Sequence, residues 1–268
     1  MITGAARGIG KAVAMKFASE GANIAFTDLV LNDDMAAGLE ATRQEIEALG
    51  VTCRAYAGNA ADFAETETVV KQIHADFGSI DILVNNAGIN IPCLLVDPKD
   101  PHGKYELSER VYDKVTSVNI KGVYLMAQAL GHEFVRNGAG VIINMSSESG
   151  LEGSEGQSIY AATKNAVNSF TRSWSKELGR YNVRVVGVAP GILEATGLRT
   201  LAYEEALSYT RGITVEDLRK GYKNTKTTPL GRSGKLTEVA NLVLFLASDR
   251  ASYIHGVTYN VAGGKTRG

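Results

Sequence analysis

The sequence predicts an α/β protein with a Rossmann-like, doubly wound parallel sheet and helices on both faces, formed as a single domain of residues 1–268. Short β-rich apolar runs alternate along the chain with stretches whose apolar residues recur at helical spacing. Such alternation implies right-handed crossovers between parallel strands. No internal repeat, low-complexity tract or linker interrupts it, and 268 residues lie within the range of one large domain.

The predicted elements follow one another in strand–helix order. Only Met1 and Ile2 precede the first loop, so either the first strand is very short or it begins before Met1. The other strands are expected at residues 23–27, 52–57, 80–85, 140–146, 184–189 and 257–261. Helices are expected at residues 8–20, 32–49, 63–77, 108–136, 160–180 and 237–247.

Two segments depart from this rhythm. Residues 92–107 hold three of the five prolines, which is typical of an irregular surface loop. Residues 193–232 are long and polar, with one short helical stretch inside them. Because ligands of open α/β sheets bind beyond the carboxyl ends of the strands, we expect residues 193–232 to form a substrate lid.

Composition limits the class of partner. The net charge of −1 gives no reason to expect nucleic acid or an anionic membrane. No apolar run approaches bilayer-spanning length, and no signal peptide is visible. Cys53 and Cys93 belong to no CxxC pair and no Cys/His cluster, so neither a metal site nor a disulfide framework is expected. Reduced thiols of this kind indicate a cytoplasmic protein.

A glycine-rich loop, Thr3-Gly4-Ala5-Ala6-Arg7-Gly8-Ile9-Gly10, leads directly into the first helix. Glycines allow a backbone to approach a pyrophosphate, whose negative charge then faces the helix N-terminus. The spacing GxxxGxG differs from the commonest dinucleotide fingerprint, GxGxxG, so a plain tight turn is the alternative.

Asp28 strengthens the dinucleotide interpretation. It ends an apolar run about 20 residues beyond the loop, where an acidic side chain binds the adenosine ribose hydroxyls. A carboxylate there repels a 2′-phosphate, so NAD is favoured over NADP, and Arg7 is a weaker signal in the opposite direction. The alternative is an aspartate that only caps a turn.

Two further strand ends carry small or amide residues. Asn86, Ala87 and Gly88 follow the strand at 80–85 and suit a backbone that approaches a flat ring or a ribose. Asn59 and Ala60 follow the strand at 52–57 and are expected near the adenine.

Tyr160 and Lys164 are four residues apart on a predicted helix, so their side chains share one face. A free tyrosine has a pKa of about 10, and a nearby ammonium lowers it. Removing a hydride from an alcohol carbon requires loss of the hydroxyl proton, so Tyr160 is the predicted acid/base. Lys164 is expected to lower its pKa and to bond the nicotinamide ribose. Such a pair also occurs by chance on helix surfaces.

Ser147 and Asn119 add to this pair. Ser147 ends a strand thirteen residues before Tyr160, where its hydroxyl can bond the substrate oxygen and stabilise charge on it. Asn119 is polar within an apolar helical stretch. It is either a satisfied buried amide or a link in a proton relay.

In their order and spacing these motifs resemble the short-chain dehydrogenase/reductases over essentially the whole chain. The resemblance implies a catalytic tetrad of Asn119, Ser147, Tyr160 and Lys164. It places a turn, Pro190-Gly191-Ile192, beside the nicotinamide. The full set of expected cofactor contacts is Gly4, Arg7, Gly8, Ile9, Gly10, Asp28, Asn59, Ala60, Asn86, Ala87, Gly88, Tyr160, Lys164, Pro190, Gly191 and Ile192. Two features depart from the family pattern: the short first strand, and Asn59 where an Asp is usual.

The stretch between Ser147 and Tyr160 bears on the substrate. Its carboxylates, among them Glu148 and Glu152, and its hydroxyls suit a polyhydroxylated ligand rather than a steroid or an acyl chain. We therefore expect Ser147, Glu148, Glu152 and Tyr160 to contact the substrate. Basic residues that can hold a phosphate, or else are solvated surface charges, gather on predicted rim segments: Arg199, Arg232, Lys265 and Arg267.

Within the family, residues 148–157, 187–194, 196–200 and 262–268 resemble the enzymes that interconvert D-sorbitol 6-phosphate and D-fructose 6-phosphate with NAD. That resemblance also implies a homotetramer. The alternatives are a dehydrogenase for another polyol or a 3-oxo substrate, a non-catalytic NAD-binding regulator, and a purely structural oligomer. The complete tetrad disfavours a regulator, and the glycine loop disfavours a structural protein.

Overall fold

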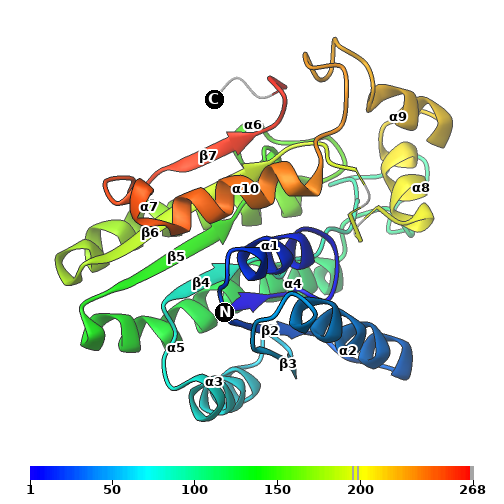
Figure 1. Ribbon diagram of the computed structural model, residues 1–268. Helices are drawn as coiled ribbons and strands as arrows, with labels where there is room; N and C mark the ends of the chain where they lie inside the picture. The colour runs from blue at the N-terminus through cyan, green and yellow to red at the C-terminus, as the bar shows by residue number, and fades with distance from the viewer. Residues whose placement is uncertain (195, 198, 266–268) are drawn as a thin grey trace.

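Seven strands form one parallel sheet in the computed structural model, which describes residues 1–194, 196–197 and 199–265 (Figure 1). Their order across the sheet is β3-β2-β1-β4-β5-β6-β7. The chain winds outward first in one direction and then, from β4 on, in the other, which confirms the predicted doubly wound topology. The strands are β1 (Ile2–Thr3), β2 (Ile24–Asp28), β3 (Cys53–Ala57), β4 (Ile82–Asn85), β5 (Gly140–Met145), β6 (Val183–Pro190) and β7 (Thr258–Val261).

Helices cover both faces of the sheet. The described α-helices are α1 (Gly8–Ser19), α2 (Asp33–Glu47), α3 (Phe63–Phe77), α4 (Glu109–Thr116), α5 (Gly122–Asn137), α6 (Ser149–Glu152), α7 (Ser158–Leu178), α8 (Leu201–Thr210), α9 (Val215–Gly221) and α10 (Leu236–Ala247). One face carries α1, α2 and α10, and the other carries α3, α5 and α7. No helix in the described part of the chain combines the length and the apolar character that a bilayer crossing needs.

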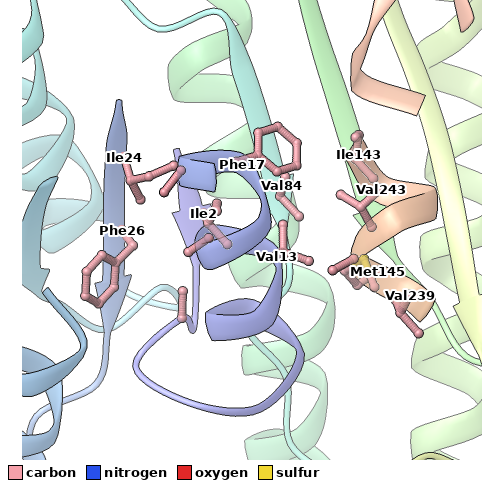
Figure 2. Close-up of a cluster of buried hydrophobic side chains, with 14 of the residues drawn as sticks. Ile2, Val13, Phe17, Ile24, Phe26, Val84, Ile143, Met145, Val239 and Val243 are labelled. Carbon is pink, nitrogen blue, oxygen red and sulfur yellow. The ribbon is translucent and has the colours of Figure 1, made fainter. Parts of the chain in front are cut away.

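Alternate strand residues supply two separate cores. Ile143 of β5 packs beneath α1 and α10, whereas its neighbour Ile142 packs beneath α5 on the opposite face. Figure 2 shows the first core, where Val13 of α1 and Val243 of α10 meet strand side chains. Because burial of each such side chain contributes about 1.5–3 kcal/mol, this packing fixes the glycine loop that precedes α1 over the sheet.

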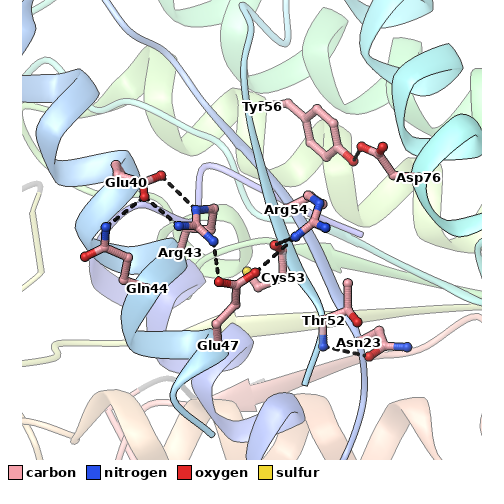
Figure 3. A network of polar contacts seen from close by, with 10 residues as sticks. All are labelled: Asn23, Glu40, Arg43, Gln44, Glu47, Thr52, Cys53, Arg54, Tyr56 and Asp76. Carbon is pink, nitrogen blue, oxygen red and sulfur yellow. Dashed lines mark hydrogen bonds and ion pairs between the residues drawn. The ribbon is translucent and has the colours of Figure 1, made fainter. Parts of the chain in front are cut away.

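Ion pairs and a tyrosine hydrogen bond fasten the edge strand β3 (Figure 3). Arg43 of α2 binds Glu47, and Glu47 in turn accepts a hydrogen bond of 3.0 Å from Arg54 of β3. On the other side, the Tyr56 hydroxyl donates to Asp76 of α3 at 2.6 Å. Such partly exposed ion pairs each contribute at most about 1 kcal/mol, so they position the strand more than they stabilise the fold.

The predicted helix over residues 108–136 is helical along its length, but its centre is a π-helix rather than an α-helix. A π-helix, Ser117–Lys121, separates α4 from α5, and the Gly122 amide bonds the Ser117 carbonyl five residues earlier. The extra residue per turn changes the direction in which the side chains around Asn119 point. A π-turn of this kind has no signal in apolar spacing, so the sequence indicates one continuous helix.

Residues 193–232, which we call the lid segment, hold two helices where one short helix is expected. Thr200 caps α8 through the Tyr203 amide, and Thr214 caps α9 through the Asp217 amide. The short helix α6 is not predicted from the sequence either. The loop predicted at residues 92–107 is confirmed as irregular, with isolated bridges from Cys93 to Gln157 and from Leu94 to Glu106.

Candidate active site

A cavity of about 240 Å³ opens beyond the carboxyl ends of β1 to β5, where the strand order reverses. We call it the cofactor cavity. Gly10 is absent from its lining, and Gly191 and Ile192 line an adjoining cavity instead. The predicted cofactor residues that do line it are Gly4, Arg7, Gly8, Ile9, Asp28, Asn59, Ala60, Asn86, Ala87, Gly88, Tyr160, Lys164 and Pro190.

Close backbone packing accounts for two glycines of the loop. Gly4 has a φ of +66°, and a Cβ on it would lie 2.8 Å from the Cα of Ala87. A Cβ on Gly10 would lie 2.4 Å from the Gly4 carbonyl oxygen. Side chains at either position would push the loop away from the segment that follows β4. Gly10 therefore shapes the cavity from beneath rather than lining it.

The N-terminus of α1 borders the cofactor cavity without a side-chain cap. Arg7, at the N-cap, makes no capping hydrogen bond, and the first turn holds no acidic residue. By contrast, Asn32, Asp62 and Ser108 cap the helices that they precede. The first amides of α1 therefore need another acceptor, and a pyrophosphate fits this positive helix end.

Asp28 lies at the end of β2 and holds the glycine loop. Its two carboxylate oxygens accept hydrogen bonds from the amides of Ala6 and Leu29, each at 2.8 Å. A carboxylate has about four acceptor positions, so two remain for a pair of ribose hydroxyls. The turn-capping role and the ribose-binding role are thus compatible in one side chain.

The two asparagines that line the cofactor cavity differ in their hydrogen bonds with neighbouring backbone. The Asn86 amide donates to the carbonyls of Thr3 and Gly4, at 3.0 and 2.8 Å, and so joins the segment after β4 to the glycine loop. Asn59 accepts from the Ala61 amide at 3.0 Å, which stabilises its own turn. Asn86 therefore shapes the cavity by holding the loop.

Tyr160, Ser147 and Lys164 converge where the cofactor cavity meets the adjoining one. The Ser147 hydroxyl lies close enough to the Tyr160 phenol to lower its pKa. The Lys164 ammonium is buried, donates to the Met145 carbonyl at 2.8 Å and lies 5.7 Å from the centre of the Tyr160 ring. A phenol beside a serine hydroxyl at the junction of two cavities is the arrangement that proton transfer to a bound alcohol or ketone requires.

The pKa of Tyr160 lies above its ordinary value. Burial is the largest cause, the Ser147 hydroxyl opposes it, and the nearby Glu148 carboxylate raises the pKa further. The predicted lowering of this pKa by Lys164 is therefore contradicted. Burial also lowers the pKa of Lys164, to about 8, and its ammonium is directed at Met145. Tyr160 accordingly holds its proton at neutral pH.

Asn119 is fully buried and lines neither cavity. Its side chain accepts from the Ile89 amide and donates to the Ile89 carbonyl, both at 2.9 Å. It also donates to the Thr163 hydroxyl at 3.0 Å, which joins the segment after β4 to the helix that carries Tyr160. A satisfied buried amide describes this side chain, and its place in a proton relay stays a prediction.

A second cavity of about 370 Å³, the substrate cavity, adjoins the first and shares Tyr160 with it. Its volume is within the range of small-molecule sites. Ser147 and Glu148 line it, as predicted, but Glu152 does not. Several polar residues of its lining are not predicted from the sequence, among them Asn90, Tyr203 and Arg211.

The acidic and basic groups predicted on the rim neutralise one another in part. Lys265 binds Glu148 and lies 3.6 Å from Glu152. Arg232 lies outside the cavity lining and pairs with Glu238 at 2.6 Å. Of the other two predicted basic residues, Arg199 lines the substrate cavity and Arg267 lies outside the described residues.

Known proteins resemble this chain over nearly all of its length. A protein that is 53% identical over the whole chain, covering 96% of that protein, is the sorbitol-6-phosphate 2-dehydrogenase of Klebsiella pneumoniae. The 3-oxoacyl-[acyl-carrier-protein] reductase of Thermotoga maritima is 38% identical, over 98% of this chain and 96% of its own.

Solved structures and a family model agree with these relatives. A crystal structure of NAD⁺-bound xylitol dehydrogenase superimposes with a TM-score of 0.85 at 25% identity, over 98% of this chain and 96% of that one. Levodione reductase gives 0.84 at 29% identity, over 98% and 95%. The family model described as short chain dehydrogenase matches residues 1–206. With the cavity at the switch point and the Tyr160–Ser147 pair, these likenesses show that the cofactor is a nicotinamide dinucleotide and that the chain belongs to the short-chain dehydrogenase/reductase family.

Proposed function

We propose that this chain is an NAD-dependent enzyme that interconverts D-sorbitol 6-phosphate and D-fructose 6-phosphate. One observation carries the reaction type: Tyr160 borders both the cofactor cavity and the substrate cavity, and Ser147 lines the substrate cavity with it. The substrate is supported by the 53% identity to sorbitol-6-phosphate 2-dehydrogenase and by the polar lining of the substrate cavity.

The chain's own residues handle the proton. In the direction of oxidation, the Tyr160 phenolate accepts the proton of the substrate hydroxyl; in reduction, the Tyr160 hydroxyl donates a proton to the ketone oxygen. Ser147 hydrogen-bonds that same substrate oxygen and stabilises the charge that develops on it. When bound, the nicotinamide supplies the hydride or accepts it. Lys164, which borders the cofactor cavity, holds the nicotinamide ribose, and Asn119 fixes the helix of Tyr160.

The proposed reaction is tested by the absorbance of reduced nicotinamide, with NAD and a panel of D-sorbitol 6-phosphate, other hexitol phosphates and D-sorbitol. We expect D-sorbitol 6-phosphate to have the highest kcat/KM of the panel. The 3-oxo alternative is tested with a 3-oxoacyl thioester and reduced cofactor. Faster turnover of an unphosphorylated polyol or of the thioester would overturn the proposed substrate.

We further propose NAD rather than NADP as the cofactor, with Asp28 as the ribose ligand. Asp28→Asn removes the negative charge that repels a 2′-phosphate, so the ratio of kcat/KM for NAD to that for NADP should fall at least about tenfold. Asp113→Asn, an exposed aspartate on α4, is the matched control and should keep the wild-type ratio. An unchanged ratio in Asp28→Asn would remove Asp28 from the ribose site.

The lid segment, the homotetramer and the cytoplasmic location belong to the same proposal. We propose one NAD-binding domain over residues 1–268, with the lid segment closing over bound substrate. Its Gly197 lies against the Arg7 side chain of the glycine loop, so the lid segment closes next to the site where the cofactor binds.

The stacked, half-buried rings of Phe170 and Trp174 on α7 support association into four chains. The mass of the protein in solution measures the number of chains that associate.

A further inference from the structure

Two guanidinium groups line the part of the substrate cavity formed by the lid segment. Arg199 precedes α8 and Arg211 follows it, so one short helix carries a basic residue at each end. We infer that Arg199 and Arg211 bind the phosphate of the substrate. This inference rests on the proposed function, because it assigns the phosphorylated end of a hexitol phosphate to the end of the cavity formed by the lid segment.

Lys265, the third basic residue of the described cavity lining, has a carboxylate partner, and so do Arg219 and Arg232 of the lid segment. Lys265 is bound to Glu148, and Arg219 pairs with Glu204 at 2.6 Å. Arg232 pairs with Glu238 in the same way. Within residues 1–194, 196–197 and 199–265, by contrast, neither Arg199 nor Arg211 forms an ion pair.

Positive charge that no carboxylate neutralises is what a dianionic phosphate requires, and a guanidinium offers it as a planar fork of N–H groups. The two arginines without ion pairs both line the cavity that Tyr160 enters. Arg199 and Arg211 therefore keep a positive charge that can bind an anion, whereas carboxylates neutralise Lys265, Arg219 and Arg232.

Arg211 is held in place, and its buried Nε is left without an acceptor. Its Nη2 donates to the Ser154 hydroxyl at 3.2 Å, and that hydroxyl donates to the Gln157 side chain at 2.7 Å. The Nε of Arg211 is buried and has no hydrogen-bond partner in the described structure. A buried, charged N–H without an acceptor is unfavourable, so the side chain is stabilised when an anion in the cavity accepts from it.

Arg199 is also fixed in position. Its Nη2 donates to the Leu193 carbonyl at 2.7 Å, and its guanidinium stacks on the Tyr222 ring at 3.9 Å from the ring centre. A guanidinium held by a carbonyl and an aromatic face keeps its charge and loses little side-chain freedom on binding a ligand. Both arginines are thus oriented before the phosphate arrives.

Tyr203 connects these arginines to the catalytic tyrosine. Its hydroxyl accepts from Gln157 at 2.7 Å and lines the same cavity. Burial raises the pKa of Tyr203, the neighbouring Tyr160 raises it further, and Arg211 lowers it. Tyr203 therefore lies near both Tyr160 and Arg211. A linear substrate that extends from Tyr160 to Arg211 would pass Tyr203.

One acidic residue of the cavity lies beside this region. Asp217 lines it, accepts from the Thr214 hydroxyl at 2.7 Å and lies 3.8 Å from the Lys220 ammonium. These contacts offset part of its charge. The remaining balance of two guanidinium groups against one solvated carboxylate favours an anion.

The experiment compares kcat/KM for D-sorbitol 6-phosphate with that for D-sorbitol in single variants. Arg199→Gln and Arg211→Gln should each lower the ratio of the two values by about 10- to 100-fold, chiefly through the KM of the phosphorylated substrate. Arg211→Lys keeps the positive charge but lacks the planar guanidinium, so it should lower the ratio by less than Arg211→Gln does. This variant replaces Arg211→Gln in the test if the glutamine variant does not fold. Inorganic phosphate should compete with substrate in the wild type and compete less well in Arg211→Gln.

Arg232→Gln is the matched control, because it makes the same change on the same segment outside the cavity lining, and it should keep the wild-type ratio. If the wild type prefers the phosphorylated substrate and both cavity variants keep that preference, the assignment of Arg199 and Arg211 is overturned while the proposed function stands. If the wild type shows no preference, the proposed function fails instead. Inhibition by inorganic phosphate that is equal in all variants would overturn the anion site in either case.

Discussion

Tyr160→Phe is expected to lower kcat by about 10²- to 10⁴-fold in both directions of the reaction, because it removes only the hydroxyl that transfers the proton. The phenyl ring that remains fills the same space between the two cavities. Binding of NAD, followed by titration of cofactor fluorescence, should therefore stay close to that of the wild type. Loss of rate with retained binding separates a chemical role from a packing role.

The matched control for Tyr160→Phe is Tyr253→Phe. Tyr253 is fully exposed, and its replacement should leave both rate and cofactor binding as they are in the wild type. A Tyr160→Phe variant that kept most of its activity would refute the acid/base assignment. A variant that lost cofactor binding to the same extent as rate would show that the ring, and not the hydroxyl, matters.

The sheet could be predicted closely because its signal is local. A buried parallel strand needs a continuous apolar run, so the predicted bounds of β2 to β7 differ from the observed ones by at most two residues. Apolar spacing gave equal precision for α3, which spans Phe63–Phe77 as predicted. Capping residues could have revealed α8 and α9, whose caps are Thr200 and Thr214, but the polar composition of the lid segment obscured these helices.

The residues of the candidate site also differ in how well the sequence predicts them. Residues tied to strand ends or to one helix face, such as Ser147 and Tyr160, come together because the topology of the fold brings those ends to one edge. Tyr203 and Arg211 reach the cavity only through the path of the lid segment, which no spacing rule describes. Nor does a sequence show which charges pair, so the neutralised Arg232 and the unpaired Arg211 look alike before folding.

The pKa of Tyr160 depends on other groups than the sequence predicts. The spacing of Tyr160 and Lys164 predicts that Lys164 controls this pKa, whereas burial, Ser147 and Glu148 control it in the folded protein. Burial keeps Tyr160 protonated at neutral pH, which suits proton donation to a ketone. Oxidation needs the phenolate, so its kcat/KM should rise with pH until the pKa of Tyr160 is passed.

Ser147→Ala is the second change with a large expected effect. It removes the hydroxyl that bonds the substrate oxygen, so kcat should fall by about 10²- to 10³-fold. Ser147→Thr, which keeps a hydroxyl, should recover part of the rate. Ser173→Ala, on the exposed face of α7, is the matched control and should have wild-type kinetics.

The pH profile of Ser147→Ala distinguishes a role toward Tyr160 from a role toward the substrate alone. The Ser147 hydroxyl lowers the pKa of Tyr160, so the loss of this hydroxyl should move the profile of oxidation to higher pH. Glu148 raises that same pKa, so Glu148→Gln should move the profile to lower pH. Shifts in opposite directions from two adjacent residues follow only if both act on one phenol. If the rate of Ser147→Ala fell with no shift in the profile, Ser147 would act on the substrate oxygen alone and would not control the protonation of Tyr160.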